Sequence, residues 1–317
     1  MLDYQSLIEH GFDIIDKRGN KKPFVLNVVQ RAYLESLSTM YPDLEGVRDN
    51  DLKARQQGFS ALIDAIFLVD FLKRPNIGAQ IISHKIKETE TLINRVNFYL
   101  DSFLEKRNVQ RSAILTTDRM DYLENKLNGS YIFIGTAGAK TLGRGGTLQN
   151  IHWSEVGFYP NTEILSAEKL VVAAEQQVAM GVGKIFREST GNMSGDYFSN
   201  ECDRSRKGES NFRFYFSPWY KNPEYALENT SGFTPTEAER NMMEKYQLSA
   251  SQILWYRLKS TEFKTRALFL REYPTTPEEA FLAGGKSFFD PDVLKYYMDR
   301  TKSPIREGSL AQDGSWA

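Results

Sequence analysis

Lys53-Ala-Arg-Gln-Gln-Gly-Phe-Ser60 leads directly into the apolar segment Ala61-Leu-Ile-Asp-Ala-Ile-Phe-Leu-Val-Asp70. The pattern G-x-x-x-x-G-K-[ST] at the start of a helix is typical of a phosphate-binding loop, or P-loop, whose backbone N–H groups and helix N-terminus face the phosphates. On that template Gly58 takes the position of the second glycine, and Ser60 takes that of the magnesium-binding hydroxyl. Because the apolar residues that follow recur at helical spacing, the stretch predicts a P-loop that opens a helix.

The lysine of this loop stands in an unusual place. Lys53 occupies the position of the first glycine, and Phe59 occupies that of the usual lysine. A lysine at the front of the loop can still reach the β- and γ-phosphates if the loop curls back, because its side chain is long and flexible. The alternative is a chance turn before a helix. The residues predicted to contact a nucleotide here are Lys53, Arg55, Gln56, Gln57, Gly58, Phe59 and Ser60.

Length and composition describe a globular chain. Of its 317 residues, 41% are hydrophobic and 26% charged, which argues against wholesale disorder. No apolar run is long enough to cross a membrane, and the N-terminus lacks the pattern of a secretory signal. Cys202 is the single cysteine, so no intrachain disulfide can form. The net charge of −1 means that any contact with DNA must be local or shared among subunits.

Predicted strands alternate with predicted helices along most of the chain. Such alternation predicts an α/β fold, with a mostly parallel central sheet flanked by helices. From about residue 211 the pattern changes to an aromatic-rich strand and then charged helices. We therefore predict a core over residues 1–210, including an N-terminal helical segment, and a smaller lid-like subdomain and linker over residues 211–317. The predicted strands are 79–83, 112–115, 130–135, 148–153, 184–189 and 212–216, and the predicted helices include 61–74, 85–106 and 166–180.

The segment that should form the strand before the loop does not fit this pattern. It reads Val47-Arg-Asp-Asn-Asp-Leu52, which is far more polar than a central parallel strand normally is. The sequence offers no physical reason for this polarity.

An acid ends the predicted strand of Asn150-Ile-His-Trp-Ser-Glu155. An ATP-hydrolysing enzyme needs a carboxylate at such a strand end to orient the attacking water, and normally a second one just before it for magnesium. Glu155 fits the first role, and the alternative is an ordinary loop acid. Ser154 stands in the second position, so metal binding would depend on water and on Ser60.

Three weaker motifs accompany these. The side-chain amide of Gln30 offers a donor and an acceptor, which suits the edge of adenine, although a surface glutamine at a helix start is the alternative. Arg144, on a glycine-rich turn, could reach a neighbouring subunit's phosphates as an arginine finger, contact DNA phosphates, or be solvated. The end of strand 184–189 carries a polar cluster that could sense hydrolysis or form a simple turn. Its residues are Ser189, Thr190, Gly191 and Asn192.

Together these motifs resemble those of the large terminase subunit of tailed bacteriophages, the ATP-driven motor that packages DNA. Residues 24–30 are similar to the adenine motif of that family, and residues 53–60 to its Walker A motif with the lysine at the front. Residues 151–155 resemble its Walker B strand with the catalytic glutamate, and residues 189–192 its coupling motif. Arg144 is placed like the family's trans-acting finger.

The resemblance covers nearly the whole chain, and it implies a P-loop NTPase fold of the ASCE or RecA-like type. It implies an ATP hydrolase with ATP and Mg²⁺ as cofactors and with Lys53, Glu155 and Arg144 as catalytic residues. The implied partners are double-stranded DNA, a portal protein, a small terminase subunit and copies of the same chain in a ring on the procapsid. The implied location is the host cytoplasm, with no membrane partner. Ala61 and Ser154 depart from the family pattern, and Ser154 leaves the magnesium ligands open.

Two further expectations follow. Full-length members of the family carry a C-terminal nuclease, and too few residues follow Asp292 to form one, so we expect this chain to represent the motor half. The alternatives to a packaging motor are another nucleic-acid translocase, such as a helicase, and a catalytically weak module that binds nucleotide or DNA. A two-domain helicase would need a second core, for which the chain has no room.

Overall fold

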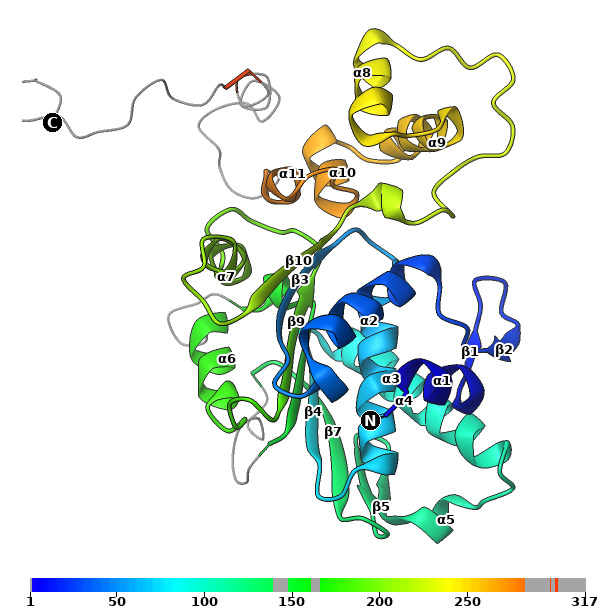
Figure 1. The fold of residues 1–317 in the computed structure, drawn as a ribbon, viewed down its shortest axis with the longest axis vertical. Coiled ribbons are helices and arrows are strands. Elements are labelled where there is room, and N and C mark those ends of the chain that lie inside the picture. Colours follow the sequence, from blue (N-terminus) through cyan, green and yellow to red (C-terminus); the bar gives the residue numbers. More distant parts are fainter. Residues whose placement is uncertain (1, 139–147, 161–165, 283–296, 298–299, 302–317) are drawn as a thin grey trace, which may run out of the picture. The chain divides into compact units, whose positions relative to one another are not determined.

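An eight-stranded sheet, in the order β10-β3-β9-β8-β4-β7-β6-β5, forms the centre of the fold (Figure 1). Adjacent strands from β10 to β7 are parallel, and β7, β6 and β5 form an antiparallel meander at the other end. The predicted α/β fold with a mostly parallel sheet is therefore confirmed. The strands are β3 (Arg48–Lys53), β4 (Gly78–Ser83), β5 (Leu115–Arg119), β6 (Tyr122–Asn125), β7 (Ser130–Thr136), β8 (Asn150–Ser154), β9 (Lys184–Ser189) and β10 (Arg213–Ser217).

The computed structural model describes residues 2–138, 148–160, 166–282, 297 and 300–301. The chain divides into two units, Met1–Ala283 and Gly284–Ala317. The second unit contains few described residues, so the sheet and all of the helices named below belong to the first.

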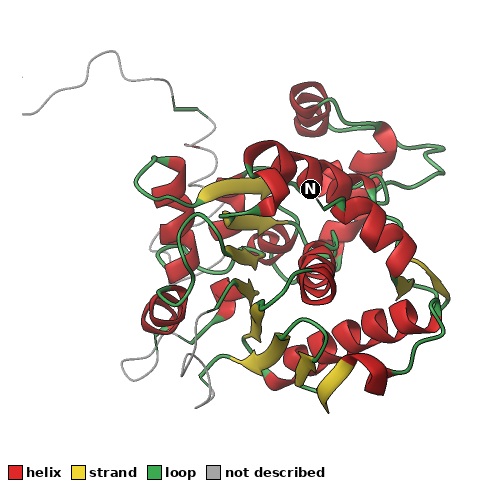
Figure 2. Ribbon diagram, turned by 60° about the horizontal axis from the view of Figure 1, so that its bottom comes forward, coloured by secondary structure: helices red, strands yellow, loops and turns green. Residues whose placement is uncertain are grey.

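Helices cover both faces of the sheet, as Figures 1 and 2 show. One face carries α1 (Tyr4–Gly11), α2 (Val28–Met40), α3 (Phe59–Lys73) and α4 (Ile86–Glu105), whose apolar side chains form the larger core. The other face carries α6 (Ala167–Glu175) and α7 (Tyr197–Arg206), which form a second core with the opposite sides of the strands. The remaining short elements of this part are the hairpin β1 (Asp13–Ile15) and β2 (Lys21–Pro23), the helix α5 (Arg111–Ile114), and the 3-10 turns Pro42–Leu44 and Val156–Phe158.

The helix after the P-loop is central to the larger core. Every residue of α3 from Leu62 to Phe71 is buried, because α3 lies between the sheet and the helices α1 and α4. A helix that is apolar on nearly all sides is expected in such a position. The start of α3 is thereby held firmly at the end of β3.

A third apolar cluster joins the last helices of the first unit. The helices that contribute to it are α8 (Glu237–Tyr246), α9 (Ala250–Thr261) and α10 (Arg266–Glu272). The next helix, α11 (Pro277–Phe281), contributes Ala280 and Phe281 to the second core. Trp219, in the 3-10 turn Trp219–Lys221 after β10, stacks on Tyr256 with ring centroids 4.7 Å apart, and Tyr256 meets Phe269 at 4.6 Å. Ala54 of the P-loop belongs to the same cluster. We call α8–α11 the C-terminal helical cluster.

The structure corrects two details of the sequence prediction. The predicted strand 112–115 is α5 followed by β5, which begins at Leu115; short apolar runs do not distinguish a helix from a strand. The predicted strand 212–216 is β10, and it pairs with β3 at the edge of the main sheet rather than within a separate lid. The division of the chain at residue 210 remains a prediction.

The polarity of β3 has a structural reason on the face toward α2. Arg213 donates from Nε and Nη2 to both carboxylate oxygens of Asp49, at 2.5 and 2.6 Å. The hydroxyl of Tyr33 lies 2.8 Å from Asp49 Oδ2 and 2.6 Å from Asp51 Oδ2. Burial, followed by the nearby charge of Asp49, raises the pKa of Asp51 well above its usual range. A protonated Asp51 fits this cluster, because one tyrosine hydroxyl carries a single hydrogen.

The polar side chains on the opposite face of β3 and at its start also have hydrogen-bond partners. Asn50 Nδ2 donates to Ser205 Oγ on α7 at 2.8 Å. Arg48 donates from Nη1 to the backbone carbonyl of Gly183 at 2.6 Å. The polar residues of β3 therefore tie the strand to β10, α2, α7 and the loop before β9, in place of the apolar contacts that such a strand usually makes.

We expect Asp49→Ala to lower the free energy of unfolding by about 3 kcal/mol or more, because it leaves Arg213 mostly buried without its counter-charge. Urea denaturation followed by circular dichroism measures the change. The control is Asp121→Ala, whose ion pair with Arg119 is exposed and should contribute little. A loss in Asp49→Ala no larger than in this control would contradict our account of β3.

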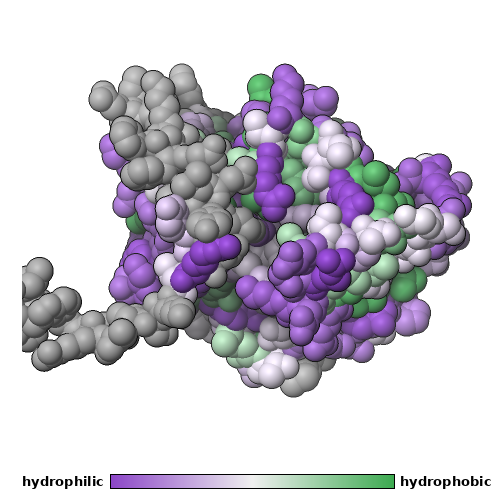
Figure 3. All heavy atoms as spheres, turned by 90° about the horizontal axis from the view of Figure 1, so that it is seen from above, coloured by the Kyte–Doolittle hydropathy of each residue, from purple (hydrophilic) through white to green (hydrophobic). Residues whose placement is uncertain are grey.

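Figure 3 shows a surface on which hydrophilic side chains are widespread and hydrophobic ones lie among them. Within the described part of the chain, no helix is both long enough and hydrophobic enough to cross a bilayer.

Candidate functional site

The predicted P-loop, residues 53–60, connects the end of β3 to the start of α3. Lys53 is the last residue of β3, and Gly58 caps α3 with a left-handed backbone, φ +86°. A β-carbon on Gly58 would lie 2.6 Å from Gln30 Nε2. The left-handed backbone favours glycine at this position, and a larger residue would also have to displace the end of the Gln30 side chain.

The loop is held from outside by the C-terminal part of the first unit. Arg55 donates from its backbone to the carbonyl of Glu272 at 2.8 Å, and from Nη1 to the carboxylate of Glu272 at 3.0 Å. Gln57 Nε2 donates to the carbonyl of Pro218 at 2.8 Å. The hydroxyl of Tyr225 donates to the carbonyl of Arg55. The C-terminal helical cluster and the end of β10 thus fix the shape of the loop.

Lys53 points from the loop toward the ends of β8 and β9. Its Nζ lies 2.9 Å from Glu155 Oε1 and 3.0 Å from Glu188 Oε2, and its side chain is 6% exposed. Burial alone would lower the pKa of Lys53, but the two carboxylates outweigh it and hold the pKa above its usual range. The residue is therefore a charged lysine placed between two acids.

Glu155 links Lys53 to the segment after β9. It follows β8 directly, with a left-handed backbone at φ 53°, and its side chain remains 26% exposed. Its Oε2 accepts from the backbone N–H of Thr190 at 3.1 Å and from the hydroxyl of Ser189 at 3.3 Å. One oxygen therefore contacts the lysine and the other contacts the predicted coupling residues.

Glu188 was not predicted from the sequence, and it lies at the centre of the site. Its fully buried carboxylate accepts from Ser60 Oγ at 2.5 Å and from Ser154 Oγ at 2.9 Å, both at Oε1. Burial would raise the pKa of Glu188, but Lys53 and then His152 outweigh it, so the pKa is well below its usual range. The sequence does not single Glu188 out, because Lys184 and Arg187 are also charged residues within β9.

The predicted coupling residues contact both the site and the C-terminal helical cluster. Asn192 Nδ2 donates to the carbonyl of Gly157 at 2.8 Å, just after Glu155. A β-carbon on Gly191 would lie 2.0 Å from the carbonyl oxygen of Ala280 in α11. Residue 191 must therefore be glycine, because the backbone of α11 lies directly against it.

Both polar atoms of the Gln30 side chain form hydrogen bonds within the protein. Its Nε2 donates to the carbonyl of Gly58 at 2.8 Å, and its Oε1 accepts from the backbone N–H of Asn27 at 3.0 Å. In this structure the side chain caps α2 and supports the P-loop. Recognition of adenine by Gln30 remains a prediction.

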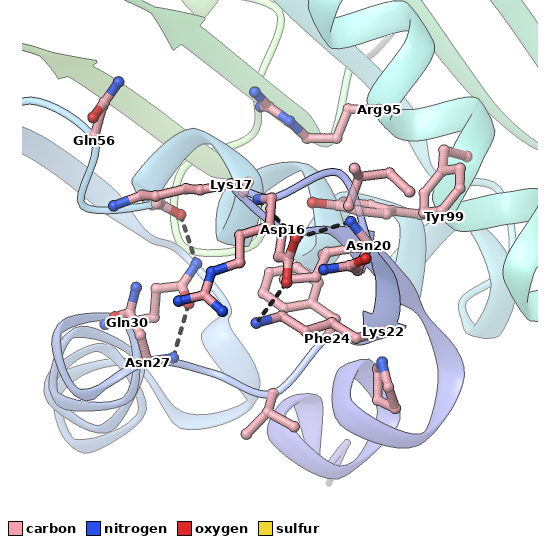
Figure 4. A pocket seen from close by; sticks show the side chains of 18 of the residues that line it. Asp16, Lys17, Asn20, Lys22, Phe24, Asn27, Gln30, Gln56, Arg95 and Tyr99 are labelled. Carbon is pink, nitrogen blue, oxygen red and sulfur yellow. Dashed lines mark hydrogen bonds and ion pairs between the residues drawn. The ribbon is translucent and has the colours of Figure 1, made fainter. Parts of the chain in front are cut away.

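Two adjoining cavities meet at the P-loop. One, of about 540 Å³, is lined by the loop together with Lys53, Ser154, Glu155 and Thr190. The other, of about 1060 Å³, lies between the β1–β2 hairpin, α2 and α4. Figure 4 shows the larger cavity, with Gln30 and Asn27 on one side and Arg95 and Tyr99 of α4 on another. Arg95 and Gly58 line both cavities, so one elongated ligand could extend from the first into the second.

Most of the predicted site residues come together here. Lys53, Ser60, Ser154, Glu155, Ser189 and Thr190 are connected through the contacts given above. The side chain of Phe59 is directed elsewhere, because it is buried in the core and packs on Tyr33 at 4.7 Å between ring centroids; only its backbone can meet a ligand. Arg144 lies outside the described residues.

No family model matches the sequence, and no curated protein matches it. Among solved structures, the HK97 bacteriophage large terminase is similar, with 12% identity and a TM-score of 0.53. That match covers 80% of this chain and 53% of the HK97 chain, so this chain spans about half the length of that protein. The ATPase domain of the Thermus phage P74-26 large terminase has 14% identity and a TM-score of 0.47, with coverage of 80% and 92%. The large terminase of another thermophilic bacteriophage, in complex with ADP, has 15% identity and a TM-score of 0.48, with coverage of 78% and 52%.

Of these three structures, only the HK97 large terminase has a TM-score above 0.5, so the comparison of folds rests on it. This chain shares the fold of the HK97 large terminase over 80% of its length, with the mostly parallel sheet flanked by helices that the sequence predicts. The resemblance to that family is thus confirmed at the level of the fold.

Proposed function

We propose that this chain is the ATPase motor domain of a tailed-bacteriophage terminase large subunit, which couples ATP hydrolysis to translocation of double-stranded DNA into a procapsid. The fold shared with the HK97 large terminase supports this proposal. One observation carries it: Lys53 of the P-loop meets the acids at the ends of β8 and β9, at 2.9 and 3.0 Å. An enzyme that hydrolyses a nucleoside triphosphate needs these groups, a phosphate-binding cation and a carboxylate for water, at one point.

In this proposal, residues 53–60 are a Walker A motif whose lysine comes from the front. The backbone N–H groups of the loop and the N-terminus of α3 face the phosphates. Lys53 leaves its two carboxylates and neutralises the β- and γ-phosphates. The base and ribose occupy the larger cavity beside Gln30, Asn27 and Tyr99, since this cavity adjoins the loop.

Residues 151–155 act as the Walker B strand. Glu155, released from Lys53, orients the water that attacks the γ-phosphate. Its second oxygen stays in contact with Ser189 and Thr190, so a change at Glu155 reaches the coupling segment. The contact between Gly191 and Ala280 then passes it to α11.

Mg²⁺ is part of the proposal, with the hydroxyl of Ser60 as one ligand and Ser154 acting through water. The oxygen atoms around Ser60 suit this hard cation. When bound, Mg²⁺ supplies charge neutralisation at the phosphate oxygens.

We propose further that the protein acts in the host cytoplasm as a ring of copies on the procapsid, with a portal protein and a small terminase subunit as partners. A net charge of −1 gives one chain little general attraction for DNA, and a ring would gather local contacts from several copies. In such a ring Arg144 would complete the neighbour's active site as an arginine finger.

We expect the ATPase activity per molecule to rise with protein concentration and Arg144→Ala to abolish this rise, because the finger comes from a neighbour. Removal of an arginine finger lowers turnover by about 10³-fold or more. Phosphate release measured over a range of protein concentrations, with and without double-stranded DNA, tests both statements. Arg119→Ala, at an exposed arginine on the meander, is the control and should behave like the unchanged protein.

The outcomes separate the proposal from its alternatives. Nucleotide binding without turnover at any concentration would indicate a catalytically weak binding module. Strand separation on a forked duplex by this chain alone would indicate a helicase. An Arg144→Ala variant as active as the control at every concentration would exclude the trans-acting finger.

A further inference from the structure

Glu188 lies directly opposite Ser154 on the neighbouring strand. β8 and β9 are parallel, and their register pairs Ser154 with Glu188. In P-loop ATPases the magnesium carboxylate stands on the strand just before the catalytic glutamate, which here is the position of Ser154. The carboxylate missing from β8 is thus present one strand away, at the same level of the sheet.

The contacts of Glu188 are those expected of a metal ligand in this fold. Its Oε1 accepts from Ser60, the hydroxyl that the P-loop template assigns to magnesium, at 2.5 Å, and from Ser154 at 2.9 Å. Its Oε2 is buried and finds no hydrogen-bond donor of good geometry among the described residues. Its one charged neighbour at that oxygen is Lys53, at 3.0 Å. A buried carboxylate is costly unless a cation balances it, and at this oxygen the ammonium of Lys53 is that cation in the structure.

A chain of buried contacts orients this carboxylate. His152 lies with Nε2 3.3 Å from Glu188 Oε1 and with Nδ1 3.0 Å from Asp64 Oδ1. Arg95 donates to Asp64 Oδ2 at 2.8 Å. Metal-binding carboxylates are commonly held in this way by hydrogen bonds from behind. Such support fixes the direction of Glu188 before any ligand arrives.

Protein groups alone do not complete a metal site here. In the part of the chain that the structure describes, no group of three or more His, Cys, Asp or Glu side chains is arranged to hold a metal ion. Mg²⁺ is usually bound by one or two carboxylates together with waters and substrate phosphates. A site made of Glu188, Ser60 and phosphate oxygens matches that description, so it would form only with the nucleotide.

We propose that Glu188 is the magnesium carboxylate of this ATPase, moved from β8 to β9. This inference rests on the proposed function and names a ligand of the same site. In the ligand-free state the ammonium of Lys53 neutralises Glu188. With nucleotide bound, Lys53 turns to the phosphates, and Glu188 with Ser60 becomes free to hold the divalent cation.

We expect Glu188→Gln to weaken Mn²⁺ binding in the presence of ADP by at least about tenfold. Electron paramagnetic resonance of free Mn²⁺ measures this directly and does not depend on turnover. The decisive partner is the double variant Ser154→Asp/Glu188→Gln, which returns a carboxylate to β8 and should recover most of the lost affinity. Glu175→Gln is the matched control, because Glu175 is also a buried glutamate in an ion pair, with Arg187, away from the P-loop.

The binding of ADP without metal can be measured by the fluorescence of a labelled nucleotide. This measurement distinguishes a failure of the proposed function from a failure of the inference about Glu188. If the unchanged protein binds neither ADP nor Mn²⁺–ADP, the proposed function fails. If it binds both, and folded Glu188→Gln holds Mn²⁺ as tightly as Glu175→Gln, this inference fails and the proposed function stands. If Glu188→Gln does not fold, the double variant decides: a folded double variant without Mn²⁺ affinity overturns the inference, and one with it supports the inference.

Discussion

Lys53→Ala is expected to weaken ATP binding by at least about thirtyfold and to remove measurable turnover. Loss of one partner from a desolvated charge pair with a ligand typically costs about 2 kcal/mol or more. Lys53 is the cation at the junction of the loop, β8 and β9, with both acids within 3.0 Å. Titration with a fluorescent ATP analogue and a phosphate-release assay measure the two effects.

The same substitution also affects folding, so it needs a second variant. Without Lys53, Glu188 is a buried charge that has lost its closest cation, and such losses cost about 3–5 kcal/mol. Lys53→Met combined with Glu188→Gln removes both charges and should recover much of the stability, but it should still fail to bind ATP. If the folded double variant binds ATP as tightly as the unchanged protein, Lys53 is not the phosphate-binding residue.

Glu155→Gln is expected to reduce ATP turnover by about 10²- to 10⁴-fold while ATP binding changes little. Glutamine keeps the shape of the side chain and an oxygen that can accept from Thr190, now 3.1 Å from the carboxylate. It loses the negative charge to which our proposal assigns the orientation of the attacking water. Single-turnover hydrolysis, compared with nucleotide affinity in the same preparation, measures the difference.

The matched control for this prediction is Glu88→Gln. Glu88 is a carboxylate that lines the same cavity but has no role in our mechanism, so its loss should leave turnover within about threefold, as for most surface changes. Turnover in Glu155→Gln equal to that of the control would show that Glu155 does not activate water.

The turn at Gly58 and the helix α3 could be predicted because their signals are local. Gly58, Ser60 and the apolar residues of α3 lie within one short stretch, and each has a conformational or packing requirement that the stretch itself reveals. The alternation of strands and helices likewise predicted the parallel sheet. The meander β5–β6 was missed, since its short strands are only half buried and carry weak periodicity.

The polar strand β3 could not be understood from the sequence, because its partners are far away along the chain. Asp49 is satisfied by Tyr33 and by Arg213, and the second of these is 164 residues distant. No pattern within the segment indicates that pairing. The unusual polarity of β3 is visible in the sequence, but its cause is visible only once the order of the strands in the sheet is known.

Glu188 was missed for a related reason. The sequence predicts a strand over residues 184–189, and its polar cluster marks only the end of that strand. The register between β8 and β9 brings Glu188 beside Ser154, and register is a property of the sheet. A serine at the expected place of an acid should therefore prompt a search of neighbouring strands for the acid.

The two ion pairs of Lys53 also affect which anions the loop can bind. An incoming orthophosphate would have to separate the ammonium from both Glu155 and Glu188 while adding its own negative charge beside them. Such an anion offers no metal ion to balance the acids and too few contacts with the loop to compensate. The two ion pairs of Lys53 therefore disfavour simple anions, whereas a nucleotide makes further contacts with the loop that help to offset their separation.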